Sequence, residues 1–385
     1  MTTPRHVAIM GVTGSIGRQT LEVLRTAPEE FVLDSVAGGT NLEALAEVVK
    51  EFNLTRVGIA RDDDRGAFAR LVGPNVDIVT GAEGLRELAS ASALVVNAVV
   101  GFAGLPVTLA TLAAGNRLAL ANKESLVAAA PLVQQVRASG GDIVPVDSEH
   151  CAIHQCLVGA TGDGYRDVSR LLLTASGGPF RTLPADQLSS VTLDDALQHP
   201  TWSMGPKITV DSSTLMNKGL EVLEASALFG ISVDRIDVVI HPQSIVHSMV
   251  EFIDGSVLAQ LSAPDMRLPI AYCLGLPDRL ATEWGRLDFA AGLHLEFSAP
   301  RRDDFPALDL AYGAARRGGA APAWLSAANE VAVAAFLERR IGWRDIVAVV
   351  ATTLDSYVDV ALTSVEELVR EDATARRVAH DTLAH

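Results

Sequence analysis

The segment His6–Ala27, HVAIMGVTGSIGRQTLEVLRTA, decides the fold that we expect for this chain. Its first residues form a short apolar run typical of a buried parallel strand, and its second half has helical periodicity. Between them, three glycines in Gly11–Gly17 allow a tight turn, and the following helix offers free N–H groups to a pyrophosphate. The spacing is G-x-x-G-x-x-G, so an ordinary strand-to-helix turn is the alternative to a dinucleotide-binding loop.

Apolar runs that alternate with helical patterns continue downstream and favour the dinucleotide-binding interpretation. We expect these further strands in a parallel sheet: Phe31–Ala37, Arg56–Ala60, Asp77–Thr80, Ala93–Val99, Arg117–Ala121 and Ile143–Val146. The first of them runs out into Gly38–Asn41, which has no carboxylate for the ribose hydroxyls of NAD, so NADP is favoured. No lysine or arginine lies in that turn, and Arg61 is a candidate partner for the 2′-phosphate.

Size and composition bound the class of protein. A chain of 385 residues, 49% hydrophobic and 20% charged, predicts a globular enzyme of two or three domains. The net charge of −16 argues against a nucleic-acid or membrane-surface partner, because anionic surfaces would repel the chain. We expect a cytoplasmic protein, since its three cysteines include no C-x-x-C pair and we find neither a membrane span nor a signal peptide.

Polar side chains follow two of the expected strands, where an open α/β sheet places its ligands. Lys123 lies between Asn122 and Glu124 after one strand, and a site role is favoured over a surface lysine. After the next strand, Asp147 and Glu149 are spaced i, i+2 and would point to one side of an extended chain. Paired carboxylates without a thiolate predict Mg²⁺ or Mn²⁺, with a solvated acidic strand end as an equal alternative.

The segment His199–Glu221, HPTWSMGPKITVDSSTLMNKGLE, combines hydrogen-bonding groups with bulky apolar residues beside Gly205 and Pro206. Such a mixture predicts a site that grips a small anion and closes over it. We expect Ser212 and Ser213 to begin a helix that carries Asn217, Lys218 and Glu221 on one face. The alternative is an ordinary capped helix with a surface Lys–Glu pair. Upstream, Ser176 before a glycine pair offers an oxyanion a hydroxyl and N–H groups, or is simply a flexible turn.

The last third predicts a change of architecture. We expect strands at Asp237–Ile240, Ser248–Ile253 and Ser256–Ser262, the last two joined at Asp254-Gly255, a strong hairpin signal. From Phe305 onward the pattern is helical. The expected fold is thus α/β, with an NADPH-binding Rossmann-like domain at 1–147, an α+β catalytic domain with a mixed or antiparallel sheet and a mobile flap at 148–290, and a linker with a helical domain at 291–385.

Six motifs in this order resemble the 1-deoxy-D-xylulose-5-phosphate reductoisomerase family across nearly the whole chain. They are GVTGSIG, ANKESLV, VDSEH, LTASGGPF, the segment His199–Glu221 and IHPQSIVHSMVEFIDGSVLAQLSAPDMR. The resemblance implies an NADPH- and metal-dependent enzyme that isomerises and reduces 1-deoxy-D-xylulose 5-phosphate to 2-C-methyl-D-erythritol 4-phosphate, a step of non-mevalonate isoprenoid precursor synthesis. It also implies a homodimer.

The same resemblance implies a role for individual residues. Three carboxylates would hold the divalent metal, Mg²⁺, Mn²⁺ or Co²⁺: Asp147, Glu149 and Glu221. The substrate would be bound or turned over by Lys123, Ser148, Glu149, Ser176, His199, Ser212, Asn217, Lys218 and Glu221, with Lys123, Glu149 and His199 as the catalytic group. NADPH would be bound by Thr13, Gly14, Ser15, Ile16, Gly39, Thr40, Asn41, Asn122, Glu124 and Gly205. Trp202 and Met204 would form the lid.

Two positions depart from the family pattern in ways that bear on function. Thr40 stands where a lysine often follows AG, which affects the binding of the 2′-phosphate. Pro206 stands where a basic residue usually follows MG, which would stiffen the flap. Two rival functions are another NADP-dependent dehydrogenase of the homoserine or semialdehyde type, which would need no metal, and a non-catalytic NADP-binding regulator, which would not need the carboxylates.

Overall fold

The computed structural model describes residues 3–158, 165–202 and 204–384, and the chain divides into two compact units. The first unit contains Met1–Ser125, Val133–Cys151 and Asp265–Trp284, and the second contains Leu126–Leu132, Ala152–Pro264 and Gly285–His385. We describe each unit by itself. The expected flap includes Ser203, which lies outside the described residues.

A seven-stranded parallel sheet forms the centre of the first unit, in the order β4-β3-β2-β1-β5-β6-β7. Its strands are β1 (Arg5–Met10), β2 (Phe31–Gly38), β3 (Arg56–Ile59), β4 (Asp77–Thr80), β5 (Leu94–Asn97), β6 (Arg117–Leu120) and β7 (Asp142–Pro145). The order reverses beside β1, and such a reversal is where open α/β sheets bind their ligands. The strands expected from the sequence are confirmed to within a few residues.

Helices cover both faces of this sheet, as the continuous apolar strands require. Along β1, Val7 and Ile9 belong to one hydrophobic cluster, whereas Ala8 and Met10 belong to another on the opposite face. The covering helices are α1 (Ser15–Thr26), α2 (Leu42–Glu51), α3 (Arg65–Val72), α4 (Gly81–Ala91), α5 (Leu105–Ala113) and α11 (Arg267–Gly275), with the short 3-10 turns η1 (Asp62–Asp64) and η2 (Gly101–Gly104). The expected Rossmann-like sheet is therefore confirmed.

Helix α11 is a part of the first unit that the sequence did not predict. It lies far along the chain but packs against α1, and its residues Ile270 to Leu274 join the core beneath the sheet. Two arginines of the sheet hold its end: Arg5 donates to the carbonyl of Leu274 at 2.6 Å, and Arg117 to that of Leu276 at 2.9 Å. Local sequence patterns cannot predict that a helix so late in the chain packs against elements formed near its start.

The second unit is built on a four-stranded mixed sheet in the order β11-β10-β8-β9. Its strands are β8 (Val168–Ala175), β9 (Ile236–Ile240), β10 (Val246–Phe252) and β11 (Val257–Leu261). Strand β8 pairs with β9 in parallel and with β10 antiparallel, while β10 and β11 form the expected antiparallel hairpin. Gly255 in its turn has a φ of 85°, a conformation that suits glycine.

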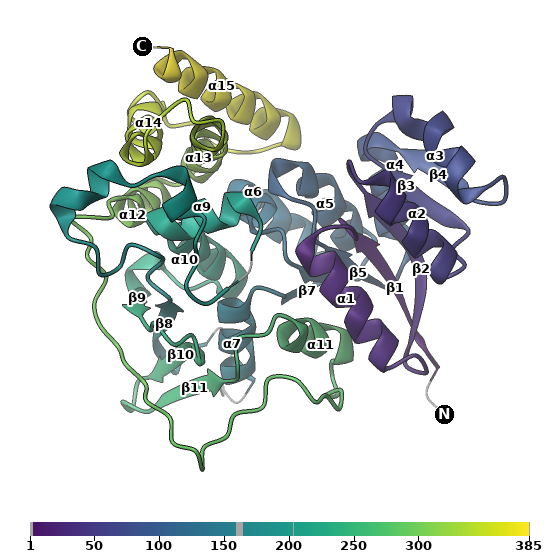
Figure 1. The fold of residues 1–385 in the computed structure, drawn as a ribbon, viewed down its shortest axis with the longest axis horizontal. Coiled ribbons are helices and arrows are strands. Elements are labelled where there is room, and N and C mark those ends of the chain that lie inside the picture. The colour runs from purple at the N-terminus through teal and green to yellow at the C-terminus, as the bar shows by residue number, and fades with distance from the viewer. Residues whose placement is uncertain (1–2, 159–164, 203, 385) are drawn as a thin grey trace. The chain divides into compact units, whose positions relative to one another are not determined.

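Helices supply the remaining regular secondary structure of the second unit (Figure 1). They are α8 (Leu193–Ala196), α9 (Pro206–Thr214), α10 (Met216–Phe229), α12 (Ala307–Arg317), α13 (Ala321–Leu337), α14 (Trp343–Asp355) and α15 (Val365–Leu383), with η3 (Ala185–Ser190) and η4 (Val233–Arg235). Helix α13 packs against both α14 and α15, which confirms the expected helical C-terminal part. Helices α6 (Lys123–Arg137) and α7 (Ser148–Leu157) contribute residues to both units.

Two local expectations are wrong. Asp147 and Glu149 do not share an extended chain, because α7 begins at Ser148 and the carbonyl of Asp147 accepts the N–H of Cys151 at 2.8 Å. Ser212 and Ser213 do not begin a helix but lie in the last turn of α9. That helix stops at Leu215, whose φ of 61° is left-handed, and α10 starts immediately after it.

Among the described residues, no helix is both long enough and apolar enough to cross a membrane. The cysteines Cys151, Cys156 and Cys273 are buried free thiols.

The tight turn after β1 leads to a first prediction, for Gly17→Ala. A methyl group on Gly17 would lie 2.4 Å from the carbonyl oxygen of Gly11, so either the loop or α1 must move. We expect the variant to lose about 1–3 kcal/mol of unfolding free energy in urea titrations and to bind NADPH more weakly. Gly66→Ala is the matched control, because a methyl group there meets nothing within 4 Å. Equal stability of the two variants would contradict the close approach.

Candidate functional site

The loop between β1 and α1 has the geometry of a turn that can bind an anion. Gly11 and Val12 donate their N–H groups to Ala37 at 2.9 Å each, which holds the loop against the end of β2. Gly14 is the N-cap residue of α1, and no side chain caps that helix. Gly14 and Ser15 are exposed, while Thr13 and Ile16 are half-buried. The free N–H groups of the first turn can therefore receive a pyrophosphate.

The turn after β2 places Gly39, Thr40 and Asn41 at the same edge of the sheet, all exposed. Asn41 caps α2 by accepting the N–H of Ala44 at 3.0 Å. Gly38 pairs in register with Ile59, so Thr40 and Arg61 lie two residues beyond neighbouring strands. The guanidinium of Arg61 lies 3.6 Å from the carboxylate of Asp63 and 3.9 Å from that of Asp64. Those carboxylates compete with any phosphate for Arg61.

Lys123, Asp147 and Glu149 gather where two neighbouring parallel strands, β6 and β7, end. Lys123 is only 6% exposed and forms an ion pair with Asp147. Ser148 donates its hydroxyl to Oε2 of Glu149 at 2.5 Å, and Nδ1 of His150 lies 3.8 Å from Oδ2 of Asp147. The sheet thus brings these predicted residues together, because parallel strands end at the same edge. Their hard carboxylate oxygens suit Mg²⁺ or Mn²⁺.

Asn122, next to this cluster, has a structural role. Its amide donates to the carbonyl oxygens of Val99 at 2.7 Å and Gly101 at 2.8 Å, and its Oδ1 accepts the N–H of Ser125 at 3.2 Å. Asn122 also donates to Glu124 at 3.2 Å, and both side chains are buried. The amide therefore ties the ends of β5 and β6 to the start of α6.

In the second unit, Ser176 and His199 form a polar pair next to β8. Nδ1 of His199 accepts the N–H groups of Thr201 at 3.2 Å and Trp202 at 2.9 Å. Because Nδ1 only accepts, Nε2 carries the ring proton and donates it to the hydroxyl of Ser176 at 2.9 Å. The same hydroxyl accepts the N–H of Gly178 at 3.2 Å. Ser176 is left with its own proton to donate to an anion.

Electrostatics keep this imidazole neutral. Burial, with a smaller contribution from the nearby charge of Arg181, lowers the pKa of His199 to about 4. Burial likewise lowers the pKa of His247 to about 4, and the charges of His241 and Lys218 act in the same direction. At neutral pH both rings therefore act as hydrogen-bonding groups without charge.

Ser212 lies close to the Ser176 loop because a glycine permits it. Gly178 has a φ of 69°, and a methyl group there would lie 2.6 Å from the carbonyl oxygen of Ser212. Any larger residue at 178 would push the loop away from α9. The glycine pair that follows Ser176 thus serves a close backbone approach between two predicted substrate-binding residues.

Helix α10 carries the remaining predicted residues of this unit on its first turns. Lys218 is 3% exposed and Glu221 1% exposed, and the two form an ion pair. Asn217 also donates to Glu221. The expectation that these three side chains share one helix face is confirmed. The buried lysine and half-buried amide at the start of α10, with Ser212 near the end of α9, make up a polar wall that can bind a phosphate.

The segment before α9 carries the apolar residues that we expected to form a lid. Trp202 and Met204 are half-buried, and the ring of Trp202 lies 6.3 Å from that of His247 on β10. Gly205 is exposed at the N-cap of α9, and Pro206 takes the first helical position, where proline is favoured.

Sequence reasoning gave no role to His247 or Arg181, although both influence this part of the second unit. His247 lies within the motif Ile240–Arg267, on the strand β10, where it is buried. Arg181 follows the Ser176 loop and acts on His199 through its charge alone. No local pattern distinguishes it from a surface arginine.

Comparison with known proteins gives one consistent result. Three family models match this chain. The model of 1-deoxy-D-xylulose 5-phosphate reductoisomerase matches residues 7–130, and the model of the C-terminal domain of that enzyme matches residues 143–229. A further model, of a DXP reductoisomerase C-terminal domain, matches residues 261–378. A protein of that name from Synechocystis sp. is 48% identical, covering 99% of this chain and 98% of its own. One from Chloroherpeton thalassium is 46% identical, covering 98% of each.

Solved structures agree in fold over the full length. The reductoisomerase of Zymomonas mobilis in complex with NADPH is 41% identical, with a TM-score of 0.91 and 99% of each chain covered. A DOX-P reductoisomerase in complex with NADPH, fosmidomycin and magnesium is 40% identical, with a TM-score of 0.94, covering 99% of this chain and 98% of its own. On this evidence the chain belongs to the 1-deoxy-D-xylulose 5-phosphate reductoisomerase family.

Proposed function

We propose that this protein converts 1-deoxy-D-xylulose 5-phosphate to 2-C-methyl-D-erythritol 4-phosphate, using NADPH and a divalent metal, in isoprenoid precursor synthesis. The observation that carries the proposal is full-length likeness to enzymes of that name, at 48% identity for one of them. The polar wall of the second unit supports a phosphorylated substrate. The Rossmann-like sheet of the first unit supports a dinucleotide.

The residues present suit both cofactors. For NADPH, the uncapped start of α1 and the glycine contact at Gly17 leave room for a pyrophosphate to approach the backbone. We assign its binding to Thr13, Gly14, Ser15, Ile16, Gly39, Thr40, Asn41, Asn122, Glu124 and Gly205. For the metal, the donors are carboxylate oxygens, which suit Mg²⁺ and Mn²⁺, and we assign Asp147, Glu149 and Glu221. A relative binds NADPH and magnesium in one complex.

The phosphate of the substrate would be held by Ser176, Ser212, Asn217 and Lys218. Ser176 donates the one proton that its two accepted hydrogen bonds leave available. Lys218 supplies charge from a buried position, where electrostatic attraction is stronger than in water. Because this binding is remote from the carbons that react, its energy can orient the substrate and draw the lid residues over it.

The carbon chemistry would take place beside Lys123, Ser148 and Glu149. When bound, the metal polarises the substrate carbonyl as a Lewis acid and NADPH supplies the hydride. Lys123 would stabilise negative charge that develops on the substrate oxygens, and Glu149 would move a hydroxyl proton. His199, uncharged and fixed in one tautomer, would orient Ser176 and contact the substrate from the lid side.

A homodimer is the assembly that we propose. Strand β11 is an edge of its sheet, and Val257 and Leu258 on it are 46% and 47% exposed. Ile253, in the turn before it, is 71% exposed. An edge strand with apolar side chains in water is a surface that pairs with another chain. Light scattering should give twice the mass of the chain, and a monomer would refute this assembly.

The cytoplasm is the compartment that we propose. All three cysteines are buried free thiols, as is usual where disulfides do not form. Burial raises the pKa of the Cys156 thiol to about 11, so it stays protonated and unreactive.

The activity can be tested directly by following NADPH absorbance with 1-deoxy-D-xylulose 5-phosphate after removal of bound metal with a chelator. We expect absorbance to fall only when Mg²⁺ or Mn²⁺ is restored, and the product to have a branched carbon skeleton by NMR. NADPH oxidation that needs no metal and gives an unbranched alcohol would point instead to a simple dehydrogenase. If NADPH is not oxidised under any of these conditions, the proposal is refuted.

The buried neutral His247 predicts how stability depends on pH. Because its folded pKa of about 4 lies below the ordinary 6.5, the unfolded chain binds more protons between these values. The contribution of neutral His247 to the free energy of unfolding is therefore fully present above pH 6.5 and is lost as the pH falls towards 4. We expect His247→Asn to reduce this acid-induced loss of unfolding free energy by on the order of 3 kcal/mol in urea titrations. His380→Asn on exposed α15 is the control, and equal losses in both variants would contradict the prediction.

A further inference from the structure

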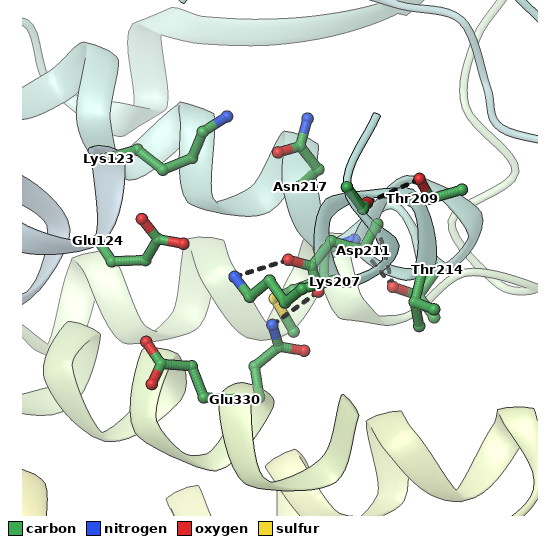
Figure 2. Close-up of polar contacts among 12 residues, drawn as sticks. Lys123, Glu124, Lys207, Thr209, Asp211, Thr214, Asn217 and Glu330 are labelled. Atoms are coloured by element: carbon green, nitrogen blue, oxygen red, sulfur yellow. Dashed lines mark hydrogen bonds and ion pairs between the residues drawn. The ribbon is translucent and has the colours of Figure 1, made fainter. Parts of the chain in front are cut away.

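Helix α9 contains a buried charge that the proposed chemistry does not use. Asp211 is 1% exposed, and its carboxylate lies 2.8 Å from Nζ of Lys207, one turn earlier on the same helix. It also accepts a hydrogen bond of 2.8 Å from Nδ2 of Asn329 on α13, which is fully buried. Figure 2 shows Lys207 and Asp211 with dashed lines for both contacts. A carboxylate only accepts, so the amide nitrogen of Asn329 must face it.

The charges of this pair are poorly placed to stabilise α9 as a helix. Lys207 lies in the first turn and Asp211 in the last, so both charges oppose the helix dipole. A lysine that precedes its acidic partner by four residues is also the weaker order for such a pair. Helix formation therefore does not explain why these charges are buried. The hydrogen bond that links Asp211 to α13 is the other interaction that could explain them.

The hydrogen bond between Asn329 and Asp211 holds α9, the helix that connects the expected lid to the polar wall. Gly205 and the lid residues precede α9, while Ser212 follows Asp211 directly. On the other side of Ser212, Ser213 accepts a hydrogen bond of 2.9 Å from Nε1 of Trp343 on α14. Two buried contacts from the C-terminal helices therefore hold the backbone on both sides of Ser212.

We propose that Asn329 is a positioning residue for substrate binding, which acts through Asp211 to fix α9 and thereby Ser212 and the end of the lid. The inference rests on the proposed function, in which Ser212 binds the substrate phosphate. It gives the C-terminal helical part of the chain a role in substrate affinity. Nine of the ten residues that we assign to NADPH lie in the first unit, and only Gly205 adjoins α9, so we expect NADPH binding to depend little on this contact.

Steady-state kinetics of Asn329→Ala, with Ser326→Ala on the same helix as control, test the proposal. We expect Asn329→Ala to raise KM for 1-deoxy-D-xylulose 5-phosphate about tenfold, or about 1.4 kcal/mol, while KM for NADPH changes less than about twofold. The control, which removes a different buried polar group from α13, the hydroxyl of Ser326, should leave both constants unchanged. A thermal unfolding curve and the NADPH constant verify that the variant is folded.

An exchange of the two groups separates positioning from general loss of structure. Asp211→Asn combined with Asn329→Asp keeps an amide-to-carboxylate hydrogen bond, so we expect it to recover most of the substrate affinity that Asp211→Asn alone loses. An unchanged substrate KM in Asn329→Ala, an equal rise in both KM values, or an exchange variant no better than the single variants would overturn the proposal.

Calorimetric titration with inorganic phosphate measures how the same substitutions affect phosphate binding, without any turnover. We expect Asn329→Ala to bind phosphate about tenfold more weakly than the wild type and Ser326→Ala, and equal affinity in all three would overturn the inference. A wild-type protein that binds phosphate but shows no turnover would refute the proposed function alone, so the two failures are distinguishable.

Discussion

The buried ion pair between Lys218 and Glu221 is the feature of the second unit that folding alone does not explain. Both side chains are almost fully buried on one turn of α10, at 3% and 1% exposure. Burying two charges costs several kcal/mol for each, and the pair repays this only when the surrounding polar groups are well placed. An apolar pair of similar volume would stabilise the helix at least as well. The charges are therefore best explained by what they bind.

Neighbouring elements of the second unit carry the groups that we propose to bind the phosphate. Leu215 takes a left-handed conformation, which ends α9 and begins α10 at once, so Ser212 and Lys218 lie on consecutive helices. Gly178 admits the Ser176 loop to within contact of Ser212, and His199 fixes the direction of the Ser176 hydroxyl. Each element supplies one group, and their positions follow from backbone geometry that only particular residues allow.

Much of this could be predicted from the sequence, and the failures have physical reasons. Apolar strands and the glycine turn after β1 are local signals, so the parallel sheet and the β10–β11 hairpin were predicted correctly. The helix boundary at Leu215 was missed because an isolated leucine in a left-handed conformation leaves no pattern. Helix α11 and the Asn329–Asp211 contact were missed because they join residues far apart in the chain. Individual ligand assignments remain predictions, since they depend on bound groups.

Thermal unfolding of Lys218→Met combined with Glu221→Leu tests most directly whether these buried charges serve binding. The account predicts an unfolding midpoint equal to or above that of the wild type, because both charges leave together, and no detectable turnover. Glu221→Leu alone, which removes the carboxylate paired with the buried lysine, should lose about 3–5 kcal/mol of stability. A double variant that unfolds as early as this single variant, or that retains turnover, would contradict the account.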